Sequence, residues 1–385
     1  ATFAWSANPY LSPATNLLQG FDNVRLTWAG DDAVPCAAAT KAKLLPNDAS
    51  VVMAPAWSGE GEGWSEHLTV TKDCAPLGVD ALLHALDAHS EPVFAYLNLL
   101  EAHHPRLPSA ASRAALLSPD EVAAGLATDG SLRRLMGAME GKESFTDEEK
   151  QALLGVYDAS LRDLDDALGT LIDGLSARGT LEKTVIVVVG DHGEHFGEDG
   201  MYDHRWSVHQ ALLHVPLVVA GPGVAPARVK EPVSTAGLFG TLPALVGLPA
   251  PSATAPTLEA RGPVFSALVA PTPRLPEVLA AWPDLPPQRW RHRYGVVVDG
   301  RHKLIRDDSG RDQLFDVVAD PLQTSPLSDP ARATELGAVL QTWRTSSPAY
   351  DPTLRTPSDR PGRPMEQDAE TKAQLELLGY TSGDP

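Results

Sequence analysis

A long amphipathic helix that leads directly into a short apolar strand constrains the fold of this chain most. The helix covers residues 147–178, and Thr146 with Glu149 forms a capping box at its start. Apolar residues recur along it at three- and four-residue steps, as a buried stripe requires: Leu154, Tyr157, Leu161, Leu164, Leu168, Leu171 and Leu175. The strand, residues 184–189, has the β-branched run of a strand buried on both faces of a parallel sheet. Helix followed by strand predicts a layered α/β fold.

A second helix and strand, and a later hairpin, extend this prediction. Residues 78–90 read as a helix and residues 92–100 as a strand. Further along, "YGVVVDGRHKLIRD" holds two strand-like runs around Asp299 and Gly300, which is a strong hairpin signal, and another strand and a helix follow. We therefore expect a sandwich with a mainly parallel central sheet flanked by helices, plus a small C-terminal antiparallel sheet with a covering helix. The expected boundaries are an α/β domain over 1–270, the small subdomain over 271–345, and an extended tail with a short terminal helix over 346–385.

Composition narrows the classes of function. The formal net charge of −19 argues against nucleic acid as a partner, because phosphate binding needs a basic surface. It does not argue against a small anionic substrate, since a bound metal ion can reverse the local field. No apolar run approaches the roughly 20 residues of a membrane-spanning helix. The two cysteines, Cys36 and Cys74, cannot build a disulfide framework, and Cys74 is interpreted as structural.

Asp191 and His192 follow Gly190, the glycine at which the apolar strand 184–189 stops. The carboxyl ends of strands are where α/β sheets place their ligands, and a carboxylate oxygen with an imidazole nitrogen suits a divalent cation. The alternative is an aspartate that caps the next turn beside a partly exposed histidine. The dipeptide alone leaves both interpretations open.

Four further residues are candidates for contacts with substrate. His103 and His104 follow the strand at 92–100, where a histidine can act as a general acid or bind an oxyanion, or can lie on the surface of a proline-terminated loop. His204 and Arg205 can reach an anionic ester oxygen, or can belong to a solvated loop.

Lys303, in the predicted hairpin, is a cationic residue that can point inward. The alternative is a lysine on the strand face, paired with a nearby aspartate.

Several segments together resemble the sulfatases of the alkaline phosphatase superfamily. "VIVVVGDHGEHFGEDG" is similar to the family's strand and D-H-G-E segment, and "LLHVPLVVAGPG" to its V-P-L-I-I-x-G-P-G. "YLNLLEAHHPRLP" is similar to its D/E-P-H-x-P-Y segment, and "YDASLRDLDDALGTLIDGL" to the helix between the two. The order agrees over nearly the whole chain. The resemblance implies a hydrolase of sulfate esters.

The resemblance also implies roles for the candidate residues. Asp191 and His192 match metal ligands, for Ca²⁺ first and Mn²⁺ second. His103 matches the histidine that contacts the ester or assists its leaving group, and either His204 or Arg205 matches a cationic residue of the site.

His104 and Lys303 are expected to bind substrate, a small-molecule or glycan sulfate ester. Asp199 and His209 depart from the family pattern, and both departures concern the substrate side of the site rather than the metal side. The alternatives are a phosphodiester or phosphonate monoester hydrolase, and a non-catalytic anion-binding relative.

The family's nucleophile lies within C/S/T-x-P-x-R, where Cys or Ser becomes formylglycine. That segment normally precedes one similar to "ANPYLSPATNLLQGFD", at which this chain begins. We therefore expect the nucleophile to lie outside this chain and the chain alone to be inactive. The resemblance also suggests a periplasmic, extracellular or membrane-anchored protein.

Overall fold

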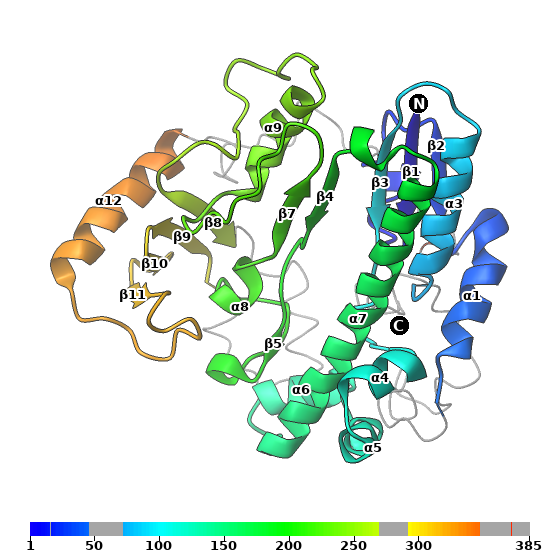
Figure 1. The fold of residues 1–385 in the computed structure, drawn as a ribbon. Helices are drawn as coiled ribbons and strands as arrows, with labels where there is room; N and C mark the ends of the chain where they lie inside the picture. The colour runs from blue at the N-terminus through cyan, green and yellow to red at the C-terminus, as the bar shows by residue number, and fades with distance from the viewer. Residues whose placement is uncertain (16, 46–71, 269–291, 347–370, 372–385) are drawn as a thin grey trace. The chain divides into compact units, whose positions relative to one another are not determined.

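The computed structural model describes residues 1–15, 17–45, 72–268, 292–346 and 371, which form two compact units (Figure 1). The first unit holds the described residues within 1–135 and 144–181, together with Thr371. The second holds those within 136–143 and 182–361. The predicted tail and terminal helix over 346–385 lie almost wholly outside the described residues.

A parallel sheet lies at the centre of the first unit. Its order is β2 (Asn23–Leu26), β1 (Thr2–Ser6) and β3 (Phe94–Asn98). The core around Phe3 and Trp5 of β1 includes Leu82 of α3 (Ala75–Asp87), and α3 packs in turn on α7 (Asp147–Ala177). Helices and a parallel sheet confirm the predicted α/β class.

The other elements of this unit are short. They are η1 (Pro13–Thr15), η2 (Gly30–Asp32), α1 (Ala33–Ala42), α4 (Ala110–Leu116) and α5 (Pro119–Ala127). Two elements, α6 (Leu132–Met139) and η3 (Leu181–Lys183), contain residues of both units. Cys36 of α1 and Cys74, the residue before α3, form a disulfide. The sequence did not predict this single bridge, because it depends on α1 and α3 lying side by side.

The helix α7 begins as predicted, and its buried face overlaps the predicted stripe in part. Leu175 is buried, and Leu164 and Leu171 pack against the core that α7 shares with α3. Thr146 Oγ1 accepts a hydrogen bond from the Glu149 amide, and the Glu149 carboxylate accepts one from the Thr146 amide. Leu161, assigned to the buried stripe, is 40% exposed. The buried positions are Ala152, Leu153, Val156, Ala159, Ser160, Ala167 and Leu175. Small side chains on this face allow close packing; at Gly174, a Cβ would lie 2.5 Å from Leu83 of α3.

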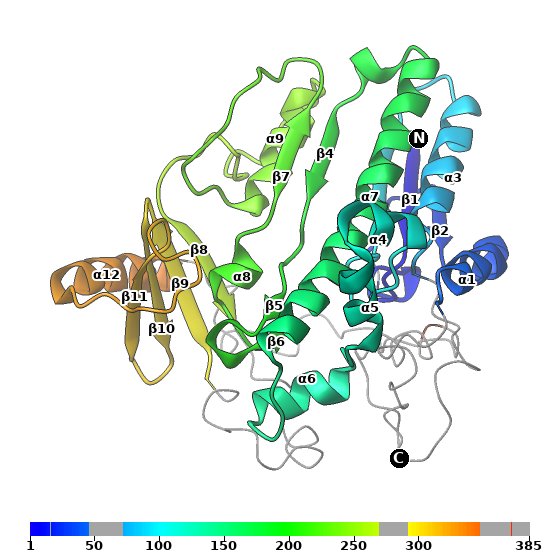
Figure 2. The same cartoon turned by 60° about the horizontal axis from the view of Figure 1, so that its bottom comes forward.

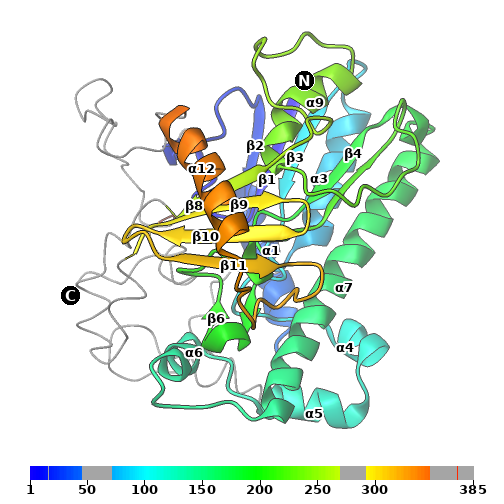
Figure 3. The same cartoon turned by 90° about the vertical axis from the view of Figure 1, so that its left-hand side faces the viewer.

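The second unit contains a four-stranded antiparallel sheet of order β11-β10-β9-β8, crossed by α12 (Pro330–Ser346) (Figure 3). The strands are β8 (Val264–Leu268), β9 (Tyr294–Asp299), β10 (His302–Asp307) and β11 (Asp312–Asp316). Gly300, with φ 59°, turns β9 into β10. Leu304 packs against Leu336 and Leu340 of α12. The predicted hairpin, third strand and covering helix are confirmed.

The strand after α7 differs from its prediction. β4 (Ile186–Val189) pairs antiparallel with β7 (Leu217–Ala220), and its residues Val188 and Val189 are 37% and 42% exposed. An apolar run indicates a strand, but it specifies neither the partner nor the direction of pairing. The remaining elements of this unit are β5 (His195–Phe196), η4 (Glu198–Gly200), β6 (Tyr202–Asp203), α8 (Gln210–Leu213), η5 (Thr235–Gly237) and α9 (Leu238–Leu245). Among the described residues, no helix has the length and hydropathy to cross a bilayer.

Candidate functional site

A tight turn follows β4 and presents Asp191 and His192. It is closed by hydrogen bonds from the Gly190 amide to Pro216 O, 3.1 Å, and from the Gly193 amide to Leu212 O, 2.9 Å. A Cβ on Gly193 would lie 2.0 Å from the Ala211 carbonyl oxygen. Because that oxygen belongs to the backbone of α8, this position requires glycine.

The side chains of Asp191 and His192 are 77% and 37% exposed, respectively. His192 Nδ1 lies 2.7 Å from the carbonyl oxygen of Gly193, so it carries the proton and leaves Nε2 as an acceptor. His192 Nε2 lies 3.9 Å from Asp191 Oδ1. A divalent cation about 2.1–2.4 Å from each atom can bridge that separation, so both residues fit a metal site.

A two-stranded hairpin returns the chain to this turn (Figure 2). β5 and β6 pair His195 with Asp203, which brings His204 back to Glu194. His204 Nδ1 lies 2.9 Å from Asp203 Oδ1 and 3.3 Å from Glu194 Oε1. The ring of His204 stacks on that of His192, with centroids 4.3 Å apart.

These carboxylates determine the charge of His204. Burial by itself lowers the pKa of His204, but Asp203 and Glu194 outweigh burial and raise this pKa to about 10. Burial by itself raises the pKa of Asp203, but the positive charges of Arg205 and His204 outweigh burial and hold this pKa well below its usual range. Ligand atoms of Glu194, Asp203 and His204 lie within 4.8 Å of one another, as in metal sites. The distances at Nδ1 indicate that this nitrogen carries a proton between the two carboxylates, and a metal ion there would have to displace that proton.

Lys303 of β10 is completely buried beside the end of this loop. Its Nζ donates hydrogen bonds to Val208 O at 2.6 Å, and to Oε1 of Gln210 and of Gln323, each at 3.1 Å. Burial lowers the pKa of Lys303 to about 7. These contacts tie Lys303 to neighbouring protein groups, and its role in substrate binding stays a prediction.

His103 and His104 belong to the first unit and follow β3. His103 Nδ1 is hydrogen-bonded to the carbonyl oxygen of His104, and His104 Nε2 lies 2.9 Å from Gly130 O. The turn before them is held by buried Glu101, which accepts a 2.6 Å hydrogen bond from the Ala75 amide at the start of α3. Burial, followed by the charge of neighbouring Asp73, raises the pKa of Glu101 to about 7.

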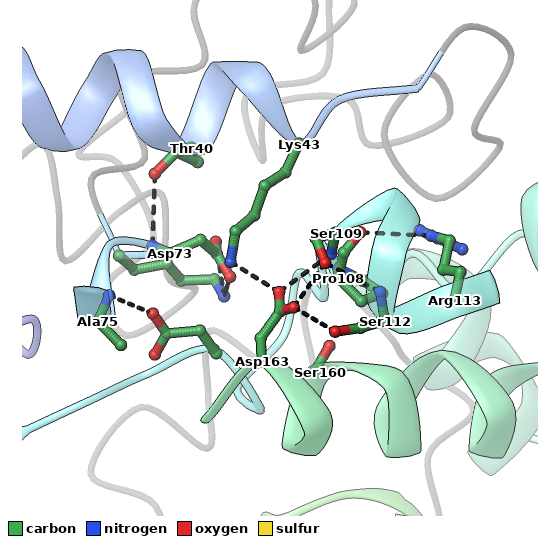
Figure 4. Close-up of polar contacts among 12 residues, drawn as sticks. Thr40, Lys43, Asp73, Ala75, Pro108, Ser109, Ser112, Arg113, Ser160 and Asp163 are labelled. Carbon is green, nitrogen blue, oxygen red and sulfur yellow. Dashed lines mark hydrogen bonds and ion pairs between the residues drawn. The ribbon is translucent and has the colours of Figure 1, made fainter. Parts of the chain in front are cut away.

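Asp163 of α7 anchors the chain beyond these histidines (Figure 4). Its Oδ1 accepts from the hydroxyls of Ser109, 2.7 Å, and Ser112, 2.6 Å, at the start of α4. Its Oδ2 accepts from the Ser109 amide, 3.0 Å, and from Lys43 Nζ, 2.8 Å. Segment 101–109 is thus fixed at both ends.

The structure groups Asp191, His192, His204 and Arg205 in one loop region of the second unit. Sequence reasoning missed Glu194 and Asp203, although Asp203 adjoins His204 and Glu194 lies two residues after His192. The roles assigned to all these residues stay predictions.

One literal S-x-P-x-R string, Ser328–Arg332, was overlooked in the sequence. Ser328 is exposed, and Arg332 pairs with Asp299 at 2.7 Å and with Glu335 at 2.8 Å. The string thus begins α12, and its arginine serves to attach the helix to β9.

Comparisons with known proteins point to one family. The sulfatase family model matches residues 55–248, just over half of the chain. A choline-sulfatase of Rhizobium meliloti (strain 1021) is 29% identical over 208 residues, which cover 53% of this chain and 39% of that protein. Arylsulfatase K of Bos taurus is 33% identical over 108 residues, 28% of this chain and 20% of that protein. The matched regions therefore span well under half of either relative.

Solved structures share the fold. The phosphonate monoester hydrolase of Silicibacter pomeroyi superposes with a TM-score of 0.58 and 21% identity, covering 88% of this chain and 73% of that one. The enzyme of the same name from Agrobacterium radiobacter also gives 0.58, at 18% identity, covering 92% and 78% of the two chains.

Proposed function

Because the chain belongs to the sulfatase family, we propose that it serves in the hydrolysis of sulfate esters at a site that holds a divalent cation. The observation that carries this proposal is the 3.9 Å separation of Asp191 Oδ1 from His192 Nε2, with Nδ1 of the same ring held by a carbonyl oxygen. An oxygen and a nitrogen ligand are thereby presented together on an exposed turn.

Each residue of the second-unit loop has a role in this proposal. Asp191 and His192 hold the cation, which when bound supplies Lewis-acid stabilisation of the ester oxygens. His204, kept protonated by Asp203 and Glu194, offers positive charge to an ester oxygen. Arg205, 3.6 Å from Asp203, adds a second positive charge to this loop.

Beyond that loop, His103 and His104, which follow β3, are proposed to contact the ester. Lys303 is proposed to contribute to substrate binding. The nucleophile is proposed to be a formylglycine of the gene product. Ca²⁺ is the first choice of metal and Mn²⁺ the second. The substrate is proposed to be a small-molecule or glycan sulfate ester.

The structural neighbours favour a second candidate, hydrolysis of phosphonate monoesters. Both solved structures with a TM-score of 0.58 are named for that activity. The two activities share the demand for a bound cation and for positive charge on ester oxygens, so the described residues fit either substrate.

Metal binding tests the site without requiring turnover. Titration of the chain with Ca²⁺ and with Mn²⁺, followed by calorimetry, should show saturable binding that Asp191→Asn weakens by more than about tenfold. Asp173→Asn makes the same change at an exposed position of α7 and should leave binding intact. Unchanged metal binding in Asp191→Asn would remove Asp191 from the site.

Activity is measured on the gene product that contains these 385 residues. Aryl sulfate, phosphate diester and phosphonate monoester substrates are compared at equal concentration. The proposal expects the sulfate ester to have the highest kcat/KM, and Asp191→Asn to lose activity and metal together. A preference for the phosphonate ester would select the second candidate, and no hydrolysis of any ester would indicate a non-catalytic relative.

A further inference from the structure

A serine, a histidine and a glutamate lie in a row in the second unit, between β5 and α8. The Ser207 hydroxyl oxygen lies 3.0 Å from Nε2 of His195, and Nδ1 of the same ring lies 3.6 Å from Oε2 of Glu198. None of these three residues has a role in the ester site proposed above. A hydroxyl, an imidazole and a carboxylate in this order form the relay that activates serine nucleophiles, which is recognised by geometry and not by sequence position.

We propose that Ser207 is a nucleophile, activated by His195 and Glu198, that accepts acyl groups from small carboxylic esters. The hydroxyl proton of Ser207 passes to His195 Nε2 while Oγ forms a bond to the carbonyl carbon. The bond from that carbon to the alkoxy oxygen then breaks, and the alcohol leaves with the proton from Nε2. Water repeats these steps on the acyl-serine, which releases the acid and restores the hydroxyl. The cycle consumes only ester and water.

The burial of His195 supports its role as the base. Its side chain is fully covered, and within the described part of the chain its Nδ1 has no hydrogen-bond partner. The Glu198 carboxylate stabilises a proton on Nδ1, which leaves Nε2 to accept from the Ser207 hydroxyl. This is the tautomer that a general base for serine needs. A contact somewhat longer than a hydrogen bond is common in catalytic sites without substrate, and it shortens in the complex.

Glu198 keeps the charge that the relay needs. Burial by itself raises the pKa of Glu198, but contacts with His195 and with the Phe196 amide outweigh burial and lower this pKa below its usual value. The Phe196 amide donates a 2.6 Å hydrogen bond to Glu198 Oε2. The carboxylate is therefore fixed in position and ionised at neutral pH.

Ser207 lies where a small substrate can reach it. It lines a pocket of about 410 Å³, a volume in the range of small-molecule sites. The His209 amide donates a 3.1 Å hydrogen bond to Ser207 Oγ, so a donor stabilises negative charge that develops on this oxygen. Trp206, the residue before Ser207, has φ 57°, a backbone conformation that is rare for a bulky residue and that is concentrated at functional sites.

The surroundings of Ser207 favour a carboxylic ester as substrate. A sulfate or phosphonate ester already carries negative charge, so attack on it needs a cation close to the nucleophile. A carboxylic ester is neutral and develops a negative charge only after attack. Among the described residues, Ser207 Oγ is hydrogen-bonded to an imidazole and to an amide, and not to a cationic side chain.

Covalent labelling of the full 385-residue chain with phenylmethanesulfonyl fluoride, in EDTA, tests this inference by peptide mass spectrometry. Ser207 Oγ should displace fluoride and form the adduct at least about 100-fold faster than the exposed Ser90 and Ser325. Ser207→Ala should remove this adduct. It should also remove the burst of nitrophenol that the parent chain releases from p-nitrophenyl acetate.

Glu198→Gln tests the part that acts through His195. It should lower the maximal labelling rate at least about tenfold and leave the reagent concentration for half of that rate unchanged. Loss of fold would not separate the two quantities in this way. Glu182→Gln, the same change at an exposed position of η3, should leave both unchanged.

Three results would overturn the inference: no adduct at Ser207, an adduct that forms no faster than at Ser90 and Ser325, and a maximal rate that Glu198→Gln does not lower. Labelling that proceeds only with Ca²⁺ or Mn²⁺ would also overturn it, because the metal ion would then activate the oxygen. If Ser207→Ala does not fold, the parent chain and Glu198→Gln decide. Sulfate ester hydrolysis enters none of these measurements, so the proposed function can fail while Ser207 labelling succeeds, and the reverse.

Discussion

Replacing Asp163 by Asn is the sharpest test of how the segment after His103 and His104 is held. Asp163 accepts four hydrogen bonds, from two hydroxyls, one amide and the Lys43 ammonium, and its side chain is 10% exposed (Figure 4). Asn keeps the shape, so no cavity forms. With its oxygen toward the two hydroxyls, its NH₂ group faces Lys43 Nζ and the Ser109 amide, and both are donors.

The expected loss follows from those two broken contacts. A hydrogen bond to a charged group contributes about 1.5–3 kcal/mol, and a buried donor left without an acceptor costs about 1–3 kcal/mol. Because the Lys43 side chain is 14% exposed, water recovers part of the loss. We expect Asp163→Asn to lower the free energy of unfolding by about 3 kcal/mol.

Equilibrium urea unfolding at neutral pH measures this change. Asp173→Asn, exposed on the same helix, should stay within about 0.5 kcal/mol of the parent protein. Adding Lys43→Met to Asp163→Asn should recover part of the loss, because the unpaired ammonium is then removed. A loss below about 1 kcal/mol in Asp163→Asn would refute the argument that this carboxylate anchors α4 to α7.

The Asp163 carboxylate should also make the free energy of unfolding depend on pH. Burial alone raises the pKa of Asp163, but hydrogen bonds from Lys43, Ser112 and Ser109 outweigh it and lower the pKa below its usual value. Its contribution to stability is therefore present above the unfolded pKa of about 3.9 and is lost as the pH falls through the folded pKa. Asp163→Asn should flatten the stability profile in this acidic range.

Three other predictions follow from single contacts. Reducing the disulfide between Cys36 and Cys74, which are 38 residues apart, should lower the free energy of unfolding by up to about 4 kcal/mol; a Cys36→Ser/Cys74→Ser variant that is insensitive to reductant is the control. Burial raises the pKa of Glu101 to about 7, so its contribution to stability should be lost as the pH rises from about 4.5 to about 7. The free energy of unfolding should fall there by roughly 1.4 kcal/mol per pH unit. Glu101→Gln should remove that slope in urea titrations, and an unchanged slope would assign it to another group. Gly193→Ala should leave the protein folded but weaken metal binding by calorimetry at least about tenfold, because its Cβ meets the Ala211 carbonyl and displaces the turn; unchanged affinity would contradict this.

Local signals were readable because they act over a few residues. The capping box at Thr146 and the turn at Gly300 satisfy neighbouring backbone groups, so the sequence determined where α7 begins and where β9 turns into β10. The family's motifs are also local, and they were sufficient to predict the fold class and the family. Periodicity predicted burial less well. It placed Leu161 inside, although this side chain is exposed, and it missed Ala167 and Gly174, which lie with the predicted Leu164 and Leu171 at the contact with α3.

Only the tertiary structure decided which distant groups meet. It gave β4 an antiparallel partner, joined Cys36 to Cys74, and placed Asp163 between Lys43 and the start of α4. It also brought Glu194 to His204, and this carboxylate adds to that of Asp203, the neighbour of His204 in sequence, in raising the pKa of the imidazole. The physical reason is that residue type and spacing fix the conformation of a segment, whereas pairing, burial and protonation depend on the groups that packing brings within a few ångströms.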